Sequence, residues 1–347
     1  MSSLRVLGRS ESYPASVVSA GLQIAYMTSL RSGRNPTLTK NPVDNAGEIT
    51  GAGGTIPANT GQVNLGSGTY TGWDWTGYQV MVDGAKTVNF VNCLFANQNY
   101  SNGLYLAYGQ RLLAIGTIAS TQGTNESVTC TNCEFDGKGS QPYGINTGGT
   151  TEGAVKCYGD FSATDCWFHD PPKDHTTLLC DVWSFTRCYF QCPGKIGNGG
   201  IYYPPGNPLN QHVDNHHIYR GTGSFTDCFF DNWDGIVPGL VGAWTCAMAS
   251  MQTTAGSGVG IIATFNRCIQ RGGATVIGDG GTVAGCPITY LCDAKTGTTI
   301  DLTITNSVLD VGTTGKYSSV ADARTTLTST NNLNYTTGNA ATLPGGP

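Results

Sequence analysis

Charged side chains are scarce in this sequence. They make up 12% of the 347 residues, where about 25% is usual for a soluble protein. The net charge at pH 7 is −5, and the 18 lysines and arginines are spread thinly along the chain. No basic surface invites a nucleic acid, so we expect a protein that does not bind DNA or RNA.

Signals for membranes and for export are also missing. No apolar run approaches the ~18 residues of a membrane span, which argues against membrane insertion. The N-terminal segment carries Arg5, Arg9 and Glu11 and only an interrupted apolar stretch. Such a segment is a poor secretory signal, and the sequence therefore predicts no signal peptide.

Metal-ligand patterns are missing as well. The pair Cys130 and Cys133 belongs to a repeat described below, and no second Cys-x-x-Cys pair with histidine accompanies it. The 13 cysteines are odd in number, and six of them recur at one position of that repeat, so we expect free thiols and folding in a reducing cytoplasm. We expect no metal and no cofactor.

What the sequence has in abundance is glycine, with 49 residues, and one repeated phrase. The phrase is an apolar or aromatic residue, a spacer, then Asn, Asp or Arg, then Cys, one residue and usually Phe. Its copies are separated by 22 to 40 residues and place at the same position Cys93, Cys133, Cys166, Cys188, Cys228, Cys268 and Ser307. The shortest separation fits one bare coil of a three-sided solenoid, and the longer ones fit coils with inserted loops.

This repeat predicts an all-β fold, a single-stranded right-handed parallel β-helix of about eight coils with a short N-terminal capping helix. A β-sandwich or propeller is less favoured, because regular Asn-Gly or Asp-Gly hairpin turns are lacking. Residues 1–61 would be a cap or anchor, with a helix over 18–30, followed by an extended connector. Residues 62–336 would form the β-helix with its loops, and 337–347 a loose tail.

The residue before each cysteine is predicted to turn a corner. Asn and Asp tolerate the left-handed backbone that lets the flanking Phe and Cys all point inward; Arg187 and Arg267 fit this less well. The residue after each cysteine would point outward, giving an exposed row of Leu94, Glu134, Trp167, Tyr189, Phe229, Ile269 and Val308. Cover by inserted loops, burial about a threefold axis between identical subunits, and stacking on sugar rings each explain such a row.

Two polar segments, 169–175 and 212–217, hold all five histidines. Their coils are two repeats apart, so they could converge on one face as an acid–base site. The residues three positions after each cysteine would form another outward column, in which His169 lies beside Asp136 and Gln191. Carboxylates one or two coils apart could flank a glycosidic bond. The alternative is that polar loop tips carry such residues anyway. The candidate catalytic residues are Asp170, Asp174, His175, Asp214, His216, Asp231 and Asp234.

Aromatic side chains are the candidates for carbohydrate binding, because their faces can stack on the apolar faces of sugars. Some lie in the long segments expected to form loops, where specificity usually resides, and others lie in the outward row. The candidate carbohydrate-binding residues are Tyr202, Tyr203, Trp233, Trp244, Trp167 and Tyr189.

Two resemblances to known families follow from these patterns. Residues 231–236, Asp-Asn-Trp-Asp-Gly-Ile, resemble the Asn-x-Asp-Gly-Ile element of polygalacturonase-type enzymes, a distant similarity to pectin-lyase-like β-helix proteins, although the Gly-His-Gly element of that family is absent. Over about residues 60–335, the Gly-Thr-Tyr-Thr-Gly-Trp-Asp-Trp segment at 68–75 and the Asn-Cys-x-Phe coils resemble β-helical minor tail or tailspike-like proteins of bacteriophages, particularly those of actinobacterial hosts.

The second resemblance implies a virion component, often a homotrimer, that attaches to other tail proteins through its N-terminal region. It would assemble in the host cytoplasm and act at the host cell surface. The expected function is a structural virion protein whose loops recognise a host surface glycan. Alternatives are a polysaccharide depolymerase, hydrolase or lyase, on the same scaffold, and a purely structural tail or capsid-surface component.

Overall fold

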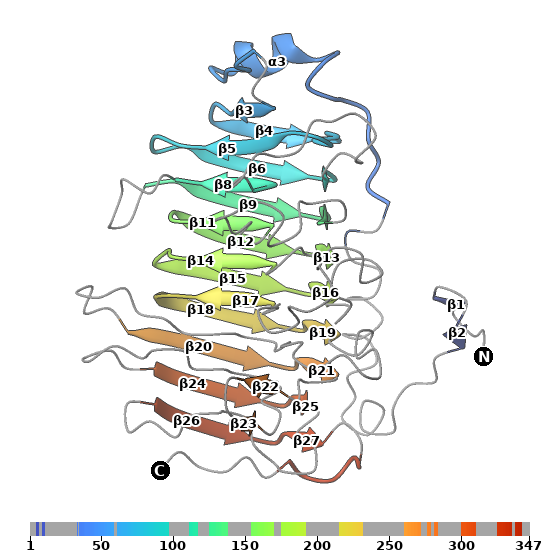
Figure 1. Ribbon diagram of the computed structural model, residues 1–347, viewed down its shortest axis with the longest axis vertical. Helices are drawn as coiled ribbons and strands as arrows, with labels where there is room; N and C mark the ends of the chain where they lie inside the picture. Colours follow the sequence, from blue (N-terminus) through green and yellow to red (C-terminus); the bar gives the residue numbers. More distant parts are fainter. Residues whose placement is uncertain are drawn as a thin grey trace.

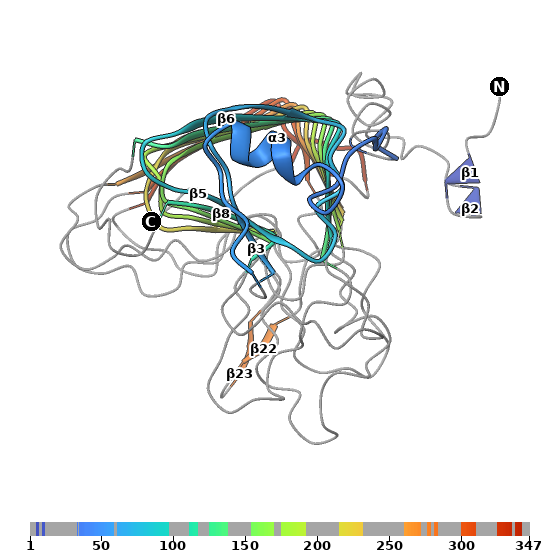
Figure 2. The ribbon, with the colours of Figure 1, turned by 90° about the horizontal axis from the view of Figure 1, so that it is seen from above.

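The computed structural model describes residues 5–6, 9–10, 33, 35–58, 61–96, 111–116, 125–137, 154–169, 175–191, 215–231, 260–271, 276–278, 281–283, 300–309, 325–334 and 337–341. These residues are nearly all β, in long parallel sheets (Figure 1). Three sheets lie around one core (Figure 2), and between residues 79 and 231 the described strands visit each of them in turn.

The nine-stranded sheet forms the longest face. Its strands are β4 (Gly68–Thr71), β6 (Thr87–Val91), β9 (Ser127–Thr131), β12 (Asp160–Thr164), β15 (Val182–Thr186), β18 (Gly221–Thr226), β20 (Ile261–Asn266), β24 (Ile300–Thr305) and β26 (Thr325–Thr330). The six-stranded sheet holds β3 (Gln62–Asn64), β5 (Gln79–Val82), β8 (Leu113–Ile115), β11 (Val155–Cys157), β14 (Thr176–Leu178) and β17 (His216–Ile218).

The eight-stranded sheet forms the third face and begins just after each corner. It holds β7 (Leu94–Ala96), β10 (Glu134–Asp136), β13 (Trp167–His169), β16 (Tyr189–Gln191), β19 (Phe229–Asp231), β21 (Ile269–Arg271), β25 (Val308–Leu309) and β27 (Leu333–Asn334). Two small antiparallel pairs lie outside these sheets, β1 (Arg5–Val6) with β2 (Arg9–Ser10) and β22 (Val276–Gly278) with β23 (Gly281–Val283).

The corner between the nine-stranded and eight-stranded sheets has the predicted left-handed backbone in every copy of the repeat. The corner residues have φ between 52° and 56° and are Asn92, Asn132, Asp165, Arg187, Asp227, Arg267 and Asn306, with an eighth corner at Asn331. The corner amide hydrogen of each of the first seven donates to a carbonyl of the next coil, as Asp165 does to Thr186. The corner therefore bends the chain without interrupting the ladder of hydrogen bonds.

Arg187 and Arg267, the two corners expected to fit poorly, share this geometry and gain an ion pair. Arg187 donates from Nε and from its second terminal nitrogen to the two oxygens of Asp165, at 2.7 and 2.8 Å, and Arg267 pairs in the same way with Asp227. The hydrogen bonds to Asp165 raise the pKa of the Arg187 guanidinium above its ordinary value. Each arginine thus spans one coil along the corner column.

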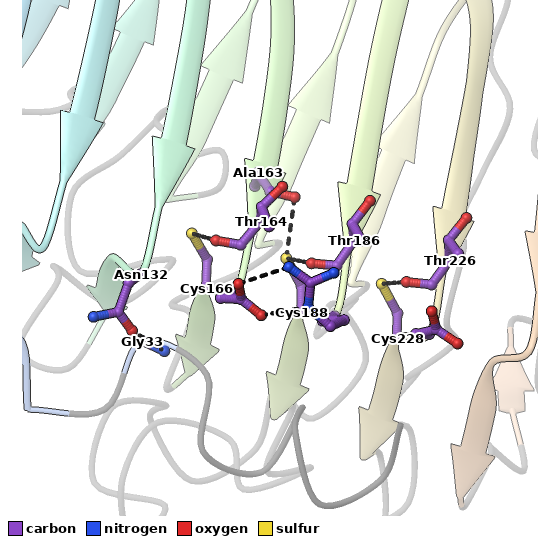
Figure 3. A network of polar contacts seen from close by, with 12 residues as sticks. Gly33, Asn132, Ala163, Thr164, Cys166, Thr186, Cys188, Thr226 and Cys228 are labelled. Atoms are coloured by element: carbon purple, nitrogen blue, oxygen red, sulfur yellow. Dashed lines mark hydrogen bonds and ion pairs between the residues drawn. The ribbon is translucent and has the colours of Figure 1, made fainter. Parts of the chain in front are cut away.

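The core between the sheets is built from the inward residues of the repeat. The rings of Phe95, Phe135 and Phe168 stack on one another with centroids 4.7 and 4.4 Å apart. Beside them runs a column of thiols from Cys93 to Cys268, all at most 1% exposed. Figure 3 shows Cys166 and Cys228 each donating from Sγ to the carbonyl of the threonine two residues earlier, at 3.3 and 3.4 Å. The nine cysteines among the described residues are free thiols, as predicted.

The row expected to be exposed is largely buried instead. Tyr189, Phe229, Ile269 and Val308 are at most 3% exposed and form a second apolar cluster on the outer side of the eight-stranded sheet, against which Trp167 and Leu333 pack. These four side chains are buried within a single chain. Neither a threefold axis nor a bound sugar is needed to cover them.

The N-terminal part contains a helix at a different place from the predicted one. The helix expected over 18–30 lies outside the described residues, whereas α3 (Ala46–Gly51) falls in the segment expected to be an extended connector. It lies at one end of the stack (Figure 1), with Ile49 fully buried. Before it, Gly33 donates to Oδ1 of Asn132 at 3.2 Å, and the amides of Thr39 and Lys40 donate to the carbonyl of Gly72. The connector therefore runs across the corners of several coils.

The corner geometry predicts an order of stability among variants of Arg187. Arg187→Val should lower the free energy of unfolding by roughly 1–2 kcal/mol, because a β-branched side chain opposes positive φ. Arg187→Asn removes the same partly exposed ion pair but tolerates this backbone, so it should cost less than about 1 kcal/mol. Urea unfolding monitored by circular dichroism measures both. Equal losses would show that the ion pair, and not the backbone, sets the cost.

The burial of the thiol column predicts that its cysteines react slowly with thiol reagents. Burial raises the pKa of Cys166, Cys188 and Cys228 well above its ordinary value, and the thiolate is the reactive form. We expect at least the nine described thiols to stay unreactive toward Ellman's reagent at pH 8 in the native protein, and all 13 to react in guanidinium chloride. Rapid native reaction of more than four thiols would contradict the buried column.

Candidate functional site

Most residues predicted to act in catalysis or sugar binding lie outside the described residues. This applies to Asp170, Asp174, Asp214, Asp234, Tyr202, Tyr203, Trp233 and Trp244. Asp231 belongs to β19, where its backbone pairs with Gln191 and Arg271. The remaining candidates are His175, His216, Trp167 and Tyr189, and the structure separates them into two environments.

His175 and His216 lie inside the core, with 0% exposure. The imidazole centroid of His216 is 4.4 Å from the ring of Phe190 and 4.7 Å from that of Phe225, and its Nδ1 lies 2.7 Å from Oγ1 of Thr176 in the adjacent strand. The ring of His175 is 6.0 Å from that of Phe190. The two histidines are thus close to the same phenylalanine, but they have no access to a substrate in solution.

His169 lies on the outer face of the eight-stranded sheet, where it contacts two carboxylates. Its Nε2 is 3.1 Å from Oε1 of Glu134, and its Nδ1 is 3.7 Å from Oδ1 of Asp136. The expected neighbours Asp136 and Gln191 are its register partners on the two adjacent strands. The imidazole is 8% exposed, while the side chains of Glu134 and Asp136 are 16% and 27% exposed.

The indole of Trp167 completes this group, which we call the carboxylate–histidine cluster (Glu134, Asp136, Trp167 and His169). The indole stacks on the imidazole of His169, with centroids 3.7 Å apart and planes 20° from parallel. Trp167 keeps part of its surface exposed. On its other side it lies parallel to Tyr189 at 6.4 Å, and Tyr189 in turn stacks on Phe229 at 5.2 Å.

Tyr189 is buried more deeply than Trp167. It is 3% exposed and has an aromatic neighbour on each side. Of the two described aromatic candidates, Trp167 is the more exposed, although His169 and Tyr189 lie on its two faces.

Sequence reasoning missed Glu134 as a site residue. In the expected outward row it was the one acidic member among apolar residues, and it lies diagonally across from His169 on the neighbouring strand. Diagonal pairs on one face of a sheet are within reach of long side chains. The combination of an isolated acid and a diagonal histidine was the signal that could have found it.

The chemistry of the cluster follows from its groups. Two carboxylates accept hydrogen bonds, and the imidazole can donate or accept depending on its protonation. A ring next to hydrogen-bonding groups is the combination that recognises a sugar, which has an apolar face and a polar edge. Within the described residues no group of three or more His, Cys, Asp or Glu side chains has an arrangement that could hold a metal ion.

Comparison with family models, with curated proteins and with solved structures gives no match for this chain. In the part of the chain that the structure describes, none of the helices is long and apolar enough to span a membrane.

A double-mutant cycle measures how strongly Glu134 holds His169. We expect Glu134→Ala to lower the free energy of unfolding by about 1–3 kcal/mol, because the poorly exposed imidazole loses a hydrogen bond to a charged group. The coupling between Glu134→Ala and His169→Ala should be at least ~0.5 kcal/mol, typical of residues in contact. Asp136→Asn, at a longer distance, is the matched control and should cost less. Additive effects of the first two changes would mean that the contact carries no energy.

Proposed function

We propose that the chain is a single-stranded right-handed parallel β-helix that serves as a structural virion protein of the minor-tail or tailspike-like type, and that it binds host cell-surface polysaccharide. The observation that carries the binding proposal is the carboxylate–histidine cluster. There a partly exposed indole lies beside an imidazole and two carboxylates on the outer side of the eight-stranded sheet. The phenylalanine rings on the inner side of that sheet stack closely on one another.

The scaffold supports this role physically. The stacked coils share continuous hydrogen-bond ladders and one core, which makes a rod that resists bending. Nine strands at ~4.8 Å span roughly 40 Å, and the cluster is held at a fixed height along that length. A binding surface that is rigid before it meets its ligand loses little conformational entropy on binding.

A polysaccharide depolymerase is the second candidate, favoured by one feature of the cluster. Glu134 and Asp136 are two residues apart on the outer face of one strand, which places their Cα atoms ~6.6–6.8 Å apart. Both carboxyl groups also lie beside the imidazole of His169, at 3.1 and 3.7 Å, and a pair of neighbouring carboxyl groups is what glycosidases use to flank the bond they cleave. The virion-protein proposal also includes attachment to other tail proteins through the N-terminal region and assembly as a homotrimer.

Binding and cleavage are tested together on polysaccharide fractions from candidate host envelopes. Immobilised glycan should retain the full chain, and Trp167→Ala should weaken binding by roughly tenfold or somewhat less, since an aromatic contact contributes about 0.5–1.5 kcal/mol. Lys156→Ala, an outward substitution on the six-stranded sheet, is the control and should leave binding unchanged.

The products separate the candidates. New reducing ends, or absorbance at 235 nm from unsaturated lyase products, that disappear in Glu134→Gln or Asp136→Asn would identify a depolymerase. Retention without cleavage supports the receptor-binding function. Neither binding nor cleavage with any fraction would leave a purely structural component and overturn the glycan proposal.

A further inference from the structure

The segment that leads into α3 is held against the stack at two places. We call Gly33 and residues 35–45 the strap. At the end nearer α3, the amides of Thr39 and Lys40 donate to the carbonyl oxygen of Gly72 at 2.8 and 3.0 Å. A Cβ built at Gly72 would lie 2.8 Å from Oγ1 of Thr39, closer than real Cβ atoms approach their neighbours. This end of the strap is thus seated closely on the residue after β4.

The other end of the strap lies on the hydrogen bond at which the pairing of β10 with β13 begins. In that bond the amide of Trp167 donates to the carbonyl oxygen of Cys133 at 3.0 Å. A Cβ built at Gly33 would overlap that carbonyl oxygen and lie 2.5 Å from that amide nitrogen. Gly33 also has φ 63°, a conformation that glycine adopts without steric cost. Any side chain at this position must therefore displace the strap or the two strands.

Asn132, the corner residue before β10, holds Gly33 in this position. Its Oδ1 accepts a hydrogen bond from the amide of Gly33 at 3.2 Å, and Figure 3 shows the two residues side by side. Its Nδ2 donates to Oδ1 of Asn92 on the coil before, at 2.5 Å, and its amide donates to the carbonyl oxygen of Thr164 on the coil after, at 2.9 Å. One side chain thus connects the strap to the corner column.

The two strands beneath Gly33 are the ones that carry the carboxylate–histidine cluster. Glu134 and Asp136 belong to β10, and Trp167 and His169 belong to β13. The hydrogen bond between Glu134 and His169, 3.1 Å long, joins the two strands. Hydrogen bonds weaken steeply when their geometry is disturbed, so a shift of β10 against β13 would disturb the cluster.

We propose that Gly33 and Asn132 are positioning residues for the carboxylate–histidine cluster, and that the N-terminal region acts on glycan binding through them. Residues 1–32 precede Gly33, so a partner bound to them acts along the chain on the residue that lies against β10 and β13. Coupling of this kind is carried by packed and hydrogen-bonded contacts, and the strap supplies both. The effect on binding rests on the proposed glycan function, whereas the positioning of the cluster does not.

The positioning is tested on the full chain without any glycan. The NMR signals of the His169 imidazole, assigned by their loss in His169→Gln, report the cluster because the indole of Trp167 lies 3.7 Å away and shifts them by its ring current. We expect Gly33→Ala to move these signals. Gly47→Ala is the matched control, because a Cβ there meets nothing within 4 Å, and it should leave them in place.

A second pair of variants removes the side chain that holds Gly33. Asn132→Gly keeps the left-handed corner but loses the bond to the strap, and it should move the His169 signals as well. Asn331→Gly makes the same change at the last corner, where the lost bond runs to Asn306, and is its control. Retention on immobilised glycan should weaken roughly 2- to 30-fold in Gly33→Ala and Asn132→Gly, with both controls retained like the native chain.

The outcomes separate this inference from the proposed function. Urea unfolding checks that each variant is folded. Unchanged His169 signals in folded Gly33→Ala and Asn132→Gly, or equal shifts in the controls, overturn the positioning role, and lower stability alone would then mark the strap as purely structural. Shifted signals with unchanged glycan retention overturn the coupling to binding. A native chain that no glycan retains refutes the proposed function and the coupling, while the His169 signals still decide the positioning.

Discussion

The left-handed backbone at the residue before each inward cysteine is the constraint on which the rest of the structure depends. An extended chain places residues two apart on one side, so Phe90 and Cys93 could not both enter the core without a bend between them. The bend at Asn92 brings both into the core and still lets its amide bond to the next coil. The energetic cost of positive φ is recovered because each corner lets three side chains enter the core.

The repeated corner also fixes the register of all that lies outside. Since each coil turns at the same point, residues at equal distances from the corner align in columns on every face. The phenylalanine and cysteine columns fill the core, and the row containing Tyr189 and Phe229 forms a second cluster. On the outer side of the nine-stranded sheet, two columns made almost entirely of Thr, Ser and Asn run in register from Thr69 to Thr328 and from Thr71 to Thr330. The carboxylate–histidine cluster arises in the same way, because the register of β10 with β13 places the side chains of the two strands next to one another.

Much of the fold could be predicted from the sequence, because the spacing of the repeated cysteines gives the length of each repeat. The corners, the inward cysteines, the free thiols and the pairing of Asp136 with His169 all follow from counting residues from each cysteine. The fate of the outward row could not be predicted, since alternation indicates which side a residue faces but not what packs against that side. The position of α3 was also missed, because six residues without a cap or an apolar stripe give no helical period.

The candidate site was harder to predict than the fold. Dense clusters of His and Asp in the sequence suggested a convergent loop site, yet His175 and His216 are single inward residues among phenylalanines. Proximity in sequence to polar loops was a poor guide, whereas position relative to the nearest corner was a good one. Glu134 and His169 meet across coils even though 35 residues separate them.

Stacking also explains why charge is so scarce in this chain. In a column of parallel coils, equivalent side chains are only ~4.8 Å apart, so a repeated charge would face its own copy above and below and would be destabilised. A column can therefore be neutral, as the threonines and the cysteines are, or it can alternate in sign. The corner column does alternate, from Asp165 to Arg187 to Asp227 to Arg267, with ion pairs at both Asp–Arg steps. In parallel sheets whose strands carry similar residues at aligned positions, each column must be either neutral or alternating in sign, and a low charge content is the result.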